Sequence, residues 1–418
     1  MKTTLTIQED KFLINGQYTY SEIKDTRYAG FLMNARFIQG VFDDASGRER
    51  YQRFGRVFDP EKNTDDLIQA LPEWYACGLR AITVGFQGGG PAFTINNQTI
   101  INNPYRNHGT EIDPAYLARM DRLITACDEL GMVVIVSLLY GAQTRFLADD
   151  QEIENAVVTA CTWLKEQGYT NVIIEIANEN DVYDFKDRPI IHQDYGVVHL
   201  MEKAREASGH MPVGCSGTGG YFSEAVARNS DVILIHGNSQ SRTQLYHLIQ
   251  KAKKIRPLRP IVINEDSPSI GAMRIAMSNG VSWGYYNNFT KQEPPADWHI
   301  LPGEDEYFAL RMKEELGIGK IDPTQVDHFR LCGLEKDLVY ENKRFIRLAA
   351  LYPEQIDYVE FYRSGELYDT AYDEVYMVHA VVNYYQLPVM NVQDGEIWRA
   401  VIHLGDGSTV TCEAVAGE

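Results

Sequence analysis

The chain has 418 residues, of which 44% are hydrophobic and 23% charged, a composition typical of a globular protein with one large and one small folded unit. Its 39 Lys and Arg residues against 58 Asp and Glu residues give a formal net charge of −19, which repels phosphate backbones and anionic membranes and argues against either as a partner. No stretch approaches the roughly 18 consecutive apolar residues of a membrane span, so we expect a soluble protein, and a neutral ligand suits its charge better than a polyanion.

The N-terminal sequence and the cysteines bear on the cellular location of the protein. Residues 1–16 contain no apolar segment of the kind that a signal peptide requires. The six cysteines lack the short, regular spacing of a disulfide framework or a zinc site, so we expect buried free thiols. If Met1 is the native start, both features favour the cytoplasm, and a signal peptide already removed is the alternative. The cysteines are Cys77, Cys127, Cys161, Cys215, Cys332 and Cys412.

From about residue 29 to 317, short apolar runs alternate with amphipathic stretches. Apolar runs of this length predict buried strands, and the amphipathic stretches predict helices between them, which is the pattern of βα units around a parallel sheet. The eight predicted strands cover residues 30–37, 79–86, 132–139, 171–178, 211–217, 231–237, 260–266 and 281–287.

Predicted helices lie between these strands, and glycines at positions 78, 131, 168 and 209 mark the ends of several of them. Eight strands alternating with helices predict an α/β protein with a (β/α)8 TIM barrel. The glycine-rich segment 85–91 lacks the spacing of a phosphate-binding turn, so we interpret it as a tight loop at the barrel mouth. The predicted helices cover residues 65–77, 114–130, 151–167, 194–208, 243–255 and 305–316.

After residue 318 the pattern changes to alternating strands separated by turn signals. We therefore predict two units, a barrel with a short N-terminal β segment over residues 1–318 and a small β-sandwich over residues 319–418. The stretch YVEFYRSGELYDT resembles the Ig-like modules attached to polysaccharide-degrading enzymes. Within the sandwich, strands are expected in residues 345–352, 357–370, 375–385 and 396–415, the last with a hairpin turn at GDG.

Two glutamates stand at the ends of predicted strands. The fourth strand ends in Asn178 and Glu179, and the seventh ends in Asn264 and Glu265. Because the carboxyl ends of barrel strands form the active-site face, these glutamates are expected to face each other across the barrel mouth. Hydrolysis of a glycosidic bond needs a proton donor and a second carboxylate, which retaining enzymes hold roughly 5 Å apart. The pair therefore predicts a glycoside hydrolase.

These residues resemble clan A of the glycoside hydrolases, retaining (β/α)8 enzymes with an Asn-Glu pair ending strand four and a Glu ending strand seven. The resemblance covers the whole barrel and implies that Glu179 is the acid/base, Glu265 the nucleophile and Asn178 the residue that binds the sugar 2-hydroxyl. Asn180 follows the pair where the cellulase-like pattern has proline, which leaves the subfamily open. The resemblance also implies that Trp283 is a sugar platform and that His236 is the strand-six histidine.

Further polar and aromatic residues lie at the predicted barrel mouth. Arg36, near the end of strand one, is expected to lower the pKa of Glu265 and keep it ionised, while Glu179 needs burial or a negative neighbour to stay protonated. Glu175 lies on the same face of its strand as Glu179 and is interpreted as a paired structural charge. The predicted substrate-binding residues are Asn178, His236, Trp283, Arg36, Tyr140, Asn238, Gln87 and Tyr285, with Asn288, Asp43, Asp44 and Tyr286 as further loop-mouth or packing positions.

Other chemistries find little support in the sequence. The chain has no His-x-His pair on strand one, no HExxH and no Gly-x-Ser-x-Gly elbow, so we predict neither a catalytic metal nor another cofactor, and no esterase of the α/β-hydrolase type. We predict a retaining glycoside hydrolase acting on an oligo- or polysaccharide. The alternative is an inactive carbohydrate-binding or scaffolding barrel, and a lyase or isomerase would need a strand-end lysine that is not found. The sugar, endo or exo action and the oligomeric state stay open.

Overall fold

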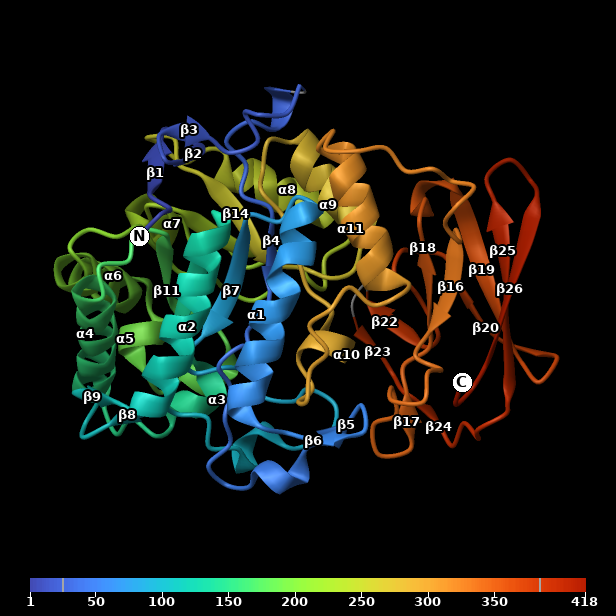
Figure 1. Cartoon of the computed structure of the whole chain (residues 1–418), viewed down its shortest axis with the longest axis horizontal. Helices are drawn as coiled ribbons and strands as arrows, with labels where there is room; N and C mark the ends of the chain where they lie inside the picture. The colour runs from blue at the N-terminus through green and yellow to red at the C-terminus, as the bar shows by residue number, and fades with distance from the viewer. Residues whose placement is uncertain (25, 383–384) are drawn as a thin grey trace.

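The computed structural model describes residues 1–24, 26–382 and 385–418 (Figure 1). The chain begins with a small antiparallel sheet, where the sequence predicted a short β segment. The Leu5 amide of this sheet donates to the Thr170 carbonyl at 2.8 Å. Leu5 and Phe12 are buried against strands of the parallel sheet that follows. This segment therefore covers one end of the sheet. Its strands are β1 Leu5–Gln8, β2 Lys11–Ile14 and β3 Gln17–Tyr18.

All eight predicted strands of the N-terminal part are present, and all pair in parallel. Six form one sheet in the order β12-β11-β10-β7-β4-β15, and β13 pairs with β14 in a second. Their burial on both faces explains the almost continuous apolar runs of the sequence. The strands are β4 Asn34–Arg36, β7 Ala81–Gly85, β10 Val133–Tyr140, β11 Val172–Asn178, β12 Val213–Gly214, β13 Ile233–His236, β14 Ile261–Glu265 and β15 Gly284–Tyr285.

A few backbone hydrogen bonds join the two parallel sheets. The Ile263 amide of β14 donates to the Ser282 carbonyl at 2.9 Å, just before β15, and the Asp231 amide before β13 donates to the Val213 carbonyl of β12 at 2.8 Å. Sequence neighbours are therefore spatial neighbours along the whole series of strands. The parallel arrangement is confirmed, and the closed eight-stranded barrel stays a prediction.

The helices of this part begin at local capping signals. Asp59 accepts hydrogen bonds from two amides of the first turn of α1, and Pro60 occupies its first position, so this helix begins five residues earlier than predicted. The glycine ends at Gly131 and Gly209 have the expected positive φ. The longer helices are α1 Pro60–Ala76, α2 Pro114–Leu130, α4 Asp150–Glu166, α6 Asp194–Ser208, α8 Arg242–Ala252, α9 Ile270–Ser278 and α11 Glu304–Glu315.

Short elements in the loops were not predicted, because they are too brief to show periodicity. They include α10, which follows β15 directly and so lies at the carboxyl end of the parallel sheet (Figure 1). The short helices are α3 Gly141–Thr144, α5 Pro189–His192, α7 Glu224–Asn229, α10 Asn288–Lys291, η1 Thr26–Tyr28, η2 Arg48–Arg50, η3 Asn97–Thr99, η4 Tyr183–Phe185 and η5 Pro353–Gln355, and the short strands are β5 Gln52–Arg53, β6 Arg56–Val57, β8 Tyr105–Arg106 and β9 Glu111–Ile112.

The C-terminal part consists of antiparallel strands with a hydrophobic core of their own around Trp398, Phe361 and Val359. The predicted GDG hairpin is confirmed, since β25 and β26 pair in register from His403 with Thr409. Residues 383 and 384 of the predicted strand 375–385 lie outside the described residues. The strands are β16 Phe329–Cys332, β17 Lys343–Arg344, β18 Arg347–Ala350, β19 Ile356–Arg363, β20 Glu366–Ala371, β21 Tyr376–Met377, β22 Ala380–Val382, β23 Tyr385–Gln386, β24 Val389–Met390, β25 Ile397–Leu404 and β26 Thr409–Val415.

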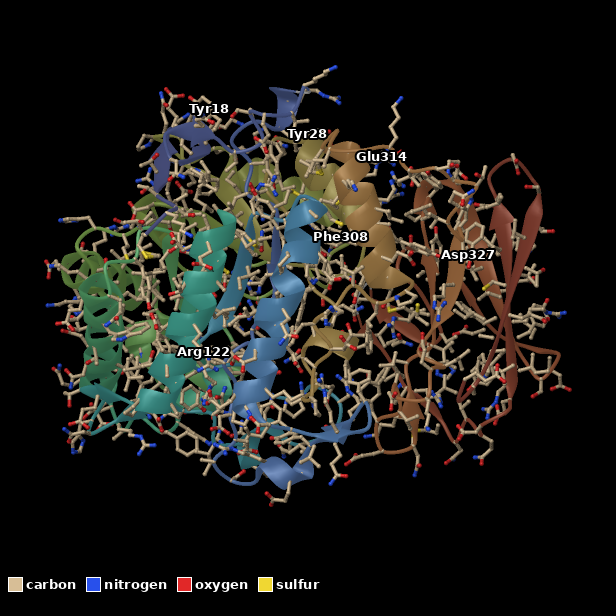
Figure 2. All side chains as sticks on the ribbon, in the orientation of Figure 1. Tyr18, Tyr28, Arg122, Phe308, Glu314 and Asp327 are labelled. Carbon is tan, nitrogen blue, oxygen red and sulfur yellow. The ribbon has the colours of Figure 1, made fainter. Side chains whose placement is uncertain are left out.

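Buried contacts fasten the C-terminal strands to the parallel-sheet part. Arg347 on β18 binds both carboxylate oxygens of Glu304 at the start of α11, at 2.7 and 2.5 Å, and both side chains are buried. On α11, Phe308, labelled in Figure 2, stacks on Tyr285 with ring centroids 4.2 Å apart. The boundary at residue 318 and the Ig-like sandwich stay predictions, whereas the attachment through Arg347 is part of the structure.

All six cysteines are free. Cys127, Cys161, Cys215 and Cys332 are buried as expected, while Cys77 and Cys412 are partly exposed, so the expectation of buried thiols was wrong for the last two. Among the described residues, no helix combines the length and apolar character that crossing a membrane requires.

Candidate active site

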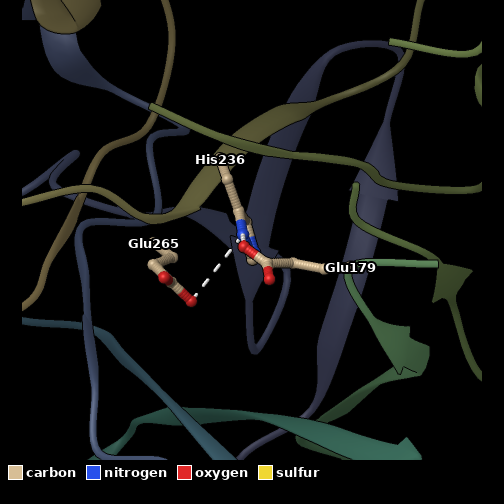
Figure 3. A group of neighbouring side chains, drawn as sticks. All are labelled: Glu179, His236 and Glu265. Atoms are coloured by element: carbon tan, nitrogen blue, oxygen red, sulfur yellow. Dashed lines mark hydrogen bonds and ion pairs between the residues drawn. The ribbon is translucent and has the colours of Figure 1, made fainter. Parts of the chain in front are cut away.

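The carboxyl ends of three strands bring Glu179, His236 and Glu265 together (Figure 3). His236 is fully buried between the two carboxylates, with Nδ1 3.0 Å from Glu179 Oε1 and 3.7 Å from Glu265 Oε2. One oxygen of each glutamate and one nitrogen of His236 lie within 4.8 Å of one another. The two glutamates that the sequence analysis paired are therefore neighbours in space.

Arg36 and Asn238 hold the Glu265 carboxylate. Arg36 Nε lies 2.6 Å from Glu265 Oε2, and Asn238 Nδ2 donates to Glu265 Oε1 at 2.7 Å. All three side chains are buried or nearly so. Both carboxylate oxygens thus receive a donor, one of them permanently charged, as favours an ionised and fixed carboxylate.

Asn178 is oriented by the same arginine. Arg36 Nη2 donates to Asn178 Oδ1 at 2.6 Å, and because a guanidinium can only donate, the oxygen of the amide must face it. The Asn178 nitrogen has no acceptor among the residues that the structure describes, and the side chain lines the cavity at the site. Asn178 therefore presents an N–H donor beside Glu179.

The backbone turns sharply at Glu179, which has a φ of 55°. This left-handed conformation is unusual for a glutamate and is a form of local strain found at functional sites. The next amide, that of Asn180, donates to the Ser216 carbonyl at 3.0 Å. Proline has no amide hydrogen, so a proline at position 180 would lose this bond.

The electrostatics at Glu179 differ from our expectation. Burial raises the pKa of the Glu179 carboxyl, but the hydrogen bond from His236 and the charges of His236 and Arg36 outweigh it and hold the pKa below its usual value. The pKa of Glu179 is therefore lowered rather than raised, because a histidine lies between the glutamates. These shifts favour an ionised Glu179 beside a protonated His236.

The pKa values of His236 and Glu265 are also shifted, and both are raised. Burial lowers the pKa of His236, yet the negative charges of Glu265 and Glu179 raise it above the ordinary value for histidine. For Glu265, burial raises the pKa and the charges of Arg36 and His236 only partly oppose it. The expected lowering by Arg36 therefore occurs, but burial exceeds it. The charge on each of the three groups therefore affects the pKa of the other two.

The two glutamates open into a cavity of about 730 Å³. Arg36, Asn178 and Asn238 line it near the glutamates, and Tyr140 and Asn288 also line it, so these predicted residues are brought together. Tyr286 lies in the same wall, with its hydroxyl bonded to Gln292 and the Arg36 guanidinium 5.7 Å from the centre of its ring. Sequence reasoning had considered Tyr286 only as a packing residue.

Three predicted substrate-binding residues lie away from the cavity. Trp283 is fully buried and donates from Nε1 to Asp266 at 3.0 Å, and the Tyr285 hydroxyl donates to Asp305 at 2.5 Å. Gln87 is also fully buried and accepts from the Tyr140 amide at 2.9 Å. None of the three lines the cavity, so the structure does not bring them to the glutamates as the sequence analysis expected. His236, also predicted to bind substrate, is fully buried behind the two carboxylates and does not line the cavity either.

Trp283 and Tyr285 both miss the cavity for the same reason. They are two residues apart around β15, so both point to the helix side of the sheet, where Phe308 packs against them. Tyr286, one residue further, points to the other side. Strand parity separates Tyr286 from Trp283, but a strand of two paired residues is too short to show this as an alternating pattern in the sequence.

Buried acids behind the glutamates are held by neutral donors. Glu175 accepts from Asn264 Nδ2 at 2.9 Å, so its partner is an amide rather than the cation we expected. Asp266 follows Glu265 and accepts from Ser267 Oγ and Trp283 Nε1, and burial raises its pKa to about 7.

Asp43 and Asp44 bind Arg48 and Arg50 within the loop after β4 and do not line the cavity.

Glu179, His236 and Glu265 have the donor types and spacing that could hold a metal ion. The Arg36 guanidinium already occupies Glu265 Oε2 at 2.6 Å, however, and a second positive ion there would be repelled. A protonated His236 would also have to lose its proton before binding a metal. The donor set therefore suits a proton better than a divalent ion.

Comparison with known proteins concerns the fold. No protein-family model and no curated protein matches the sequence. Among solved structures, an inferred glycoside hydrolase from Bacteroides vulgatus is similar, with a TM-score of 0.50 and 11% identity over 99% of this chain and 76% of that one. The chain thus has a fold that occurs among glycoside hydrolases.

Two other matches are a β-glucuronidase from Parabacteroides merdae (TM-score 0.42, 12% identity, 99% of this chain and 50% of that one) and a β-mannanase from the blue mussel Mytilus edulis (0.46, 12%, 77% and 99%). The chain spans about half the length of the β-glucuronidases it matches.

Proposed function

We propose that this protein is a retaining glycoside hydrolase whose eight parallel strands close into a (β/α)8 barrel. The observation that carries the proposal is the spacing of the two glutamates, with one oxygen of each within 4.8 Å. Retaining enzymes hold their carboxyl groups about 5 to 5.5 Å apart, whereas inverting enzymes need roughly 6.5 to 9.5 Å to admit a water molecule. The short spacing supports double displacement.

In the first step a carboxylate oxygen of Glu265 attacks the anomeric carbon and the glycosidic C–O bond breaks. The electron pair of that bond goes to the leaving oxygen, which takes a proton from Glu179. Asn178 donates its N–H to the 2-hydroxyl, and Arg36 and Asn238 hold Glu265 in line. In the second step Glu179 removes a proton from water, the water oxygen bonds to the anomeric carbon, and Glu265 leaves as a carboxylate.

His236 supplies the proton that Glu179 needs. It shares one proton with Glu179 across the 3.0 Å contact, so the pair keeps a proton for the leaving group although the pKa of Glu179 is lowered. When Glu265 is esterified in the first step, its negative charge disappears and the pKa of His236 falls. The proton of the pair has by then passed to the leaving oxygen, and the lowered pKa keeps His236 from taking up another, so the Glu179 carboxylate is free to act as the base.

A carbohydrate is the substrate that this chemistry requires, and the cavity offers it amide, guanidinium and tyrosine groups together with apolar surface. The inactive carbohydrate-binding alternative would have no need for two carboxylates held so close against their mutual repulsion. Such an arrangement is costly without a catalytic use.

The pH dependence of hydrolysis tests the proposal. A panel of 4-nitrophenyl glycosides should contain one that is hydrolysed, and its kcat/KM should follow a bell-shaped curve. Glu265 must be ionised and its pKa is raised, so activity falls in acid with a midpoint above the ordinary glutamate value of about 4.3. The His236–Glu179 pair must keep one proton, and the raised pKa of His236 places the alkaline midpoint above about 6.5.

The matched variant is His236→Gln, which removes the shared proton but keeps a polar side chain. Its alkaline midpoint should move to lower pH, because Glu179 alone must then hold the proton. An alkaline limb that stays in place in this variant would argue against the role of His236. Absence of hydrolysis across the panel and across natural oligosaccharides would contradict the proposed function itself.

A further inference from the structure

The C-terminal strands form one wall of the cavity that holds Glu179 and Glu265. Lys343 on β17, Phe345 just after it, Gln386 at the end of β23, and Leu387 and Pro388 after β23 line this cavity together with residues of the parallel-sheet part. Asn288 and Phe289 of α10 line the same cavity, and in the view of Figure 1 β23 is drawn next to α10. We call the segments 343–345 and 386–388 the C-terminal wall.

Ring packing, strand pairing and a hydrogen bond connect the C-terminal wall to its surroundings. Phe345 packs against Phe93 and Phe289, with ring centroids 4.4 and 5.2 Å apart, so it joins the loop after β7 to α10. β17 pairs with β24, where Lys343 lies opposite Met390. Gln386 donates from Nε2 to the Val378 carbonyl at 3.0 Å. A wall fixed by these contacts can position a ligand.

The exposed groups of the wall differ from those around the glutamates. Leu387 is 61% exposed although it lies at a cavity, and such a leucine leaves apolar surface in water that a ligand could cover. On the same wall, the Lys343 ammonium has one protein partner among the described residues, the exposed Glu341 at 3.4 Å. An exposed pair at this distance contributes little and leaves the ammonium available.

Apolar surface next to a hydrogen-bond donor matches a sugar ring, which has a C–H face and hydroxyl edges. The reacting sugar is expected at Asn178 and the glutamates, and Tyr140 and Tyr286 line the cavity there. A space of about 730 Å³ lies in the upper part of the range of roughly 300 to 1,000 Å³ of pockets that bury drug-sized ligands, and so exceeds the need of one hexose.

We propose that the C-terminal wall is a subsite for a second sugar unit, so that the substrate is an oligosaccharide chain rather than a simple monosaccharide glycoside. This proposal rests on the proposed function. Leu387 and Pro388 cover the C–H face of the second sugar, and Lys343 donates to one of its oxygens. The C-terminal part is then a component of the substrate site and more than a structural support.

The test compares two substrates of the same sugar, the glycosyl fluoride and the linear trisaccharide. The fluoride has a one-atom leaving group and fills only the reacting position, whereas the trisaccharide also reaches the wall. The ratio of kcat/KM for the trisaccharide to that for the fluoride should fall about tenfold in Lys343→Met and in Leu387→Asp, the size expected for one charge-assisted hydrogen bond or one lost apolar contact.

Lys336→Met and Leu367→Asp are the matched controls. Both side chains are exposed on the C-terminal part and neither lines the cavity, so both variants should keep the wild-type ratio. An unchanged ratio in Lys343→Met and Leu387→Asp, or an equal loss on both substrates, would overturn the subsite while leaving the glycosidase intact. A wild-type protein that hydrolyses neither substrate would instead overturn the proposed function, and the subsite with it.

Discussion

Replacing Glu265 by glutamine should lower kcat by at least about 10⁴-fold, because an amide cannot attack the anomeric carbon and nucleophile loss typically costs that much or more. The protein should stay folded. The amide oxygen of glutamine can still accept from Arg36 Nε, which lies 2.6 Å from the carboxylate in the wild type. Initial rates on the best aryl glycoside of the panel measure the effect, and circular dichroism with a thermal midpoint checks the fold.

Glu374→Gln is a fitting control for Glu265→Gln. Glu374 is a partly buried carboxylate that accepts from Ser269 and the amides of Ile270 and Gly271 at the start of α9, and it does not line the cavity of the two glutamates. Its replacement should cost stability but keep kcat within about tenfold of wild type. If the Glu265→Gln enzyme retained most of the wild-type kcat, Glu265 would not be the nucleophile.

Replacing Glu179 by alanine should separate the two steps of the reaction. With a poor leaving group, kcat/KM should fall about 10² to 10⁴-fold, since general acid catalysis is lost. With an activated aryl leaving group the first step needs no acid, so the glycosyl-enzyme still forms and accumulates because no base activates water. Added azide needs no base and fits the space left by the side chain, so it should restore turnover and yield a glycosyl azide.

The wild-type enzyme provides the comparison, since its Glu179 carboxylate repels azide and its rate should not increase. The product is identified by mass spectrometry, and the anomeric configuration by nuclear magnetic resonance. Failure of azide to accelerate the Glu179→Ala variant on any activated substrate would count against the acid/base role.

The positions of the two glutamates followed from strand order alone. The carboxyl ends of the strands of a (β/α)8 barrel form one face, so Asn178, Glu179 and Glu265 were expected near one another once the fourth and seventh strands were recognised. Arg36, at the end of β4, reached Glu265 for the same reason. Regular alternation of strands and helices is a strong local signal, which is why these residues could be predicted.

Side-chain direction at short strands was harder to predict. β15 has only two paired residues, so the sequence around Trp283 and Tyr285 gave no alternating pattern from which to judge which residues face the cavity. The pKa of Glu179 was missed for a related reason. Its direction depends on the position of His236 between the carboxylates, and such a contact between distant strands is set by packing rather than by sequence spacing.

The C-terminal wall had no sequence signal. Phe345 contacts Phe93 and Phe289, residues separated from it by long stretches of chain, and Leu387 looks in the sequence like any apolar residue of a strand. Only the docking of the C-terminal strands against α10 and the loop after β7 makes these residues part of the cavity. Contacts between folded units are tertiary properties that local patterns do not report.

Covalent labelling tests the central claim most directly. A 2-deoxy-2-fluoro glycoside with an activated leaving group, of the sugar preferred in the panel, should trap the glycosyl-enzyme, because fluorine slows the second step more than the first. The protein mass should increase by one fluorosugar, and peptide mapping should place the addition on Glu265. No addition with a substrate that the enzyme hydrolyses, or addition at another residue, would contradict the mechanism.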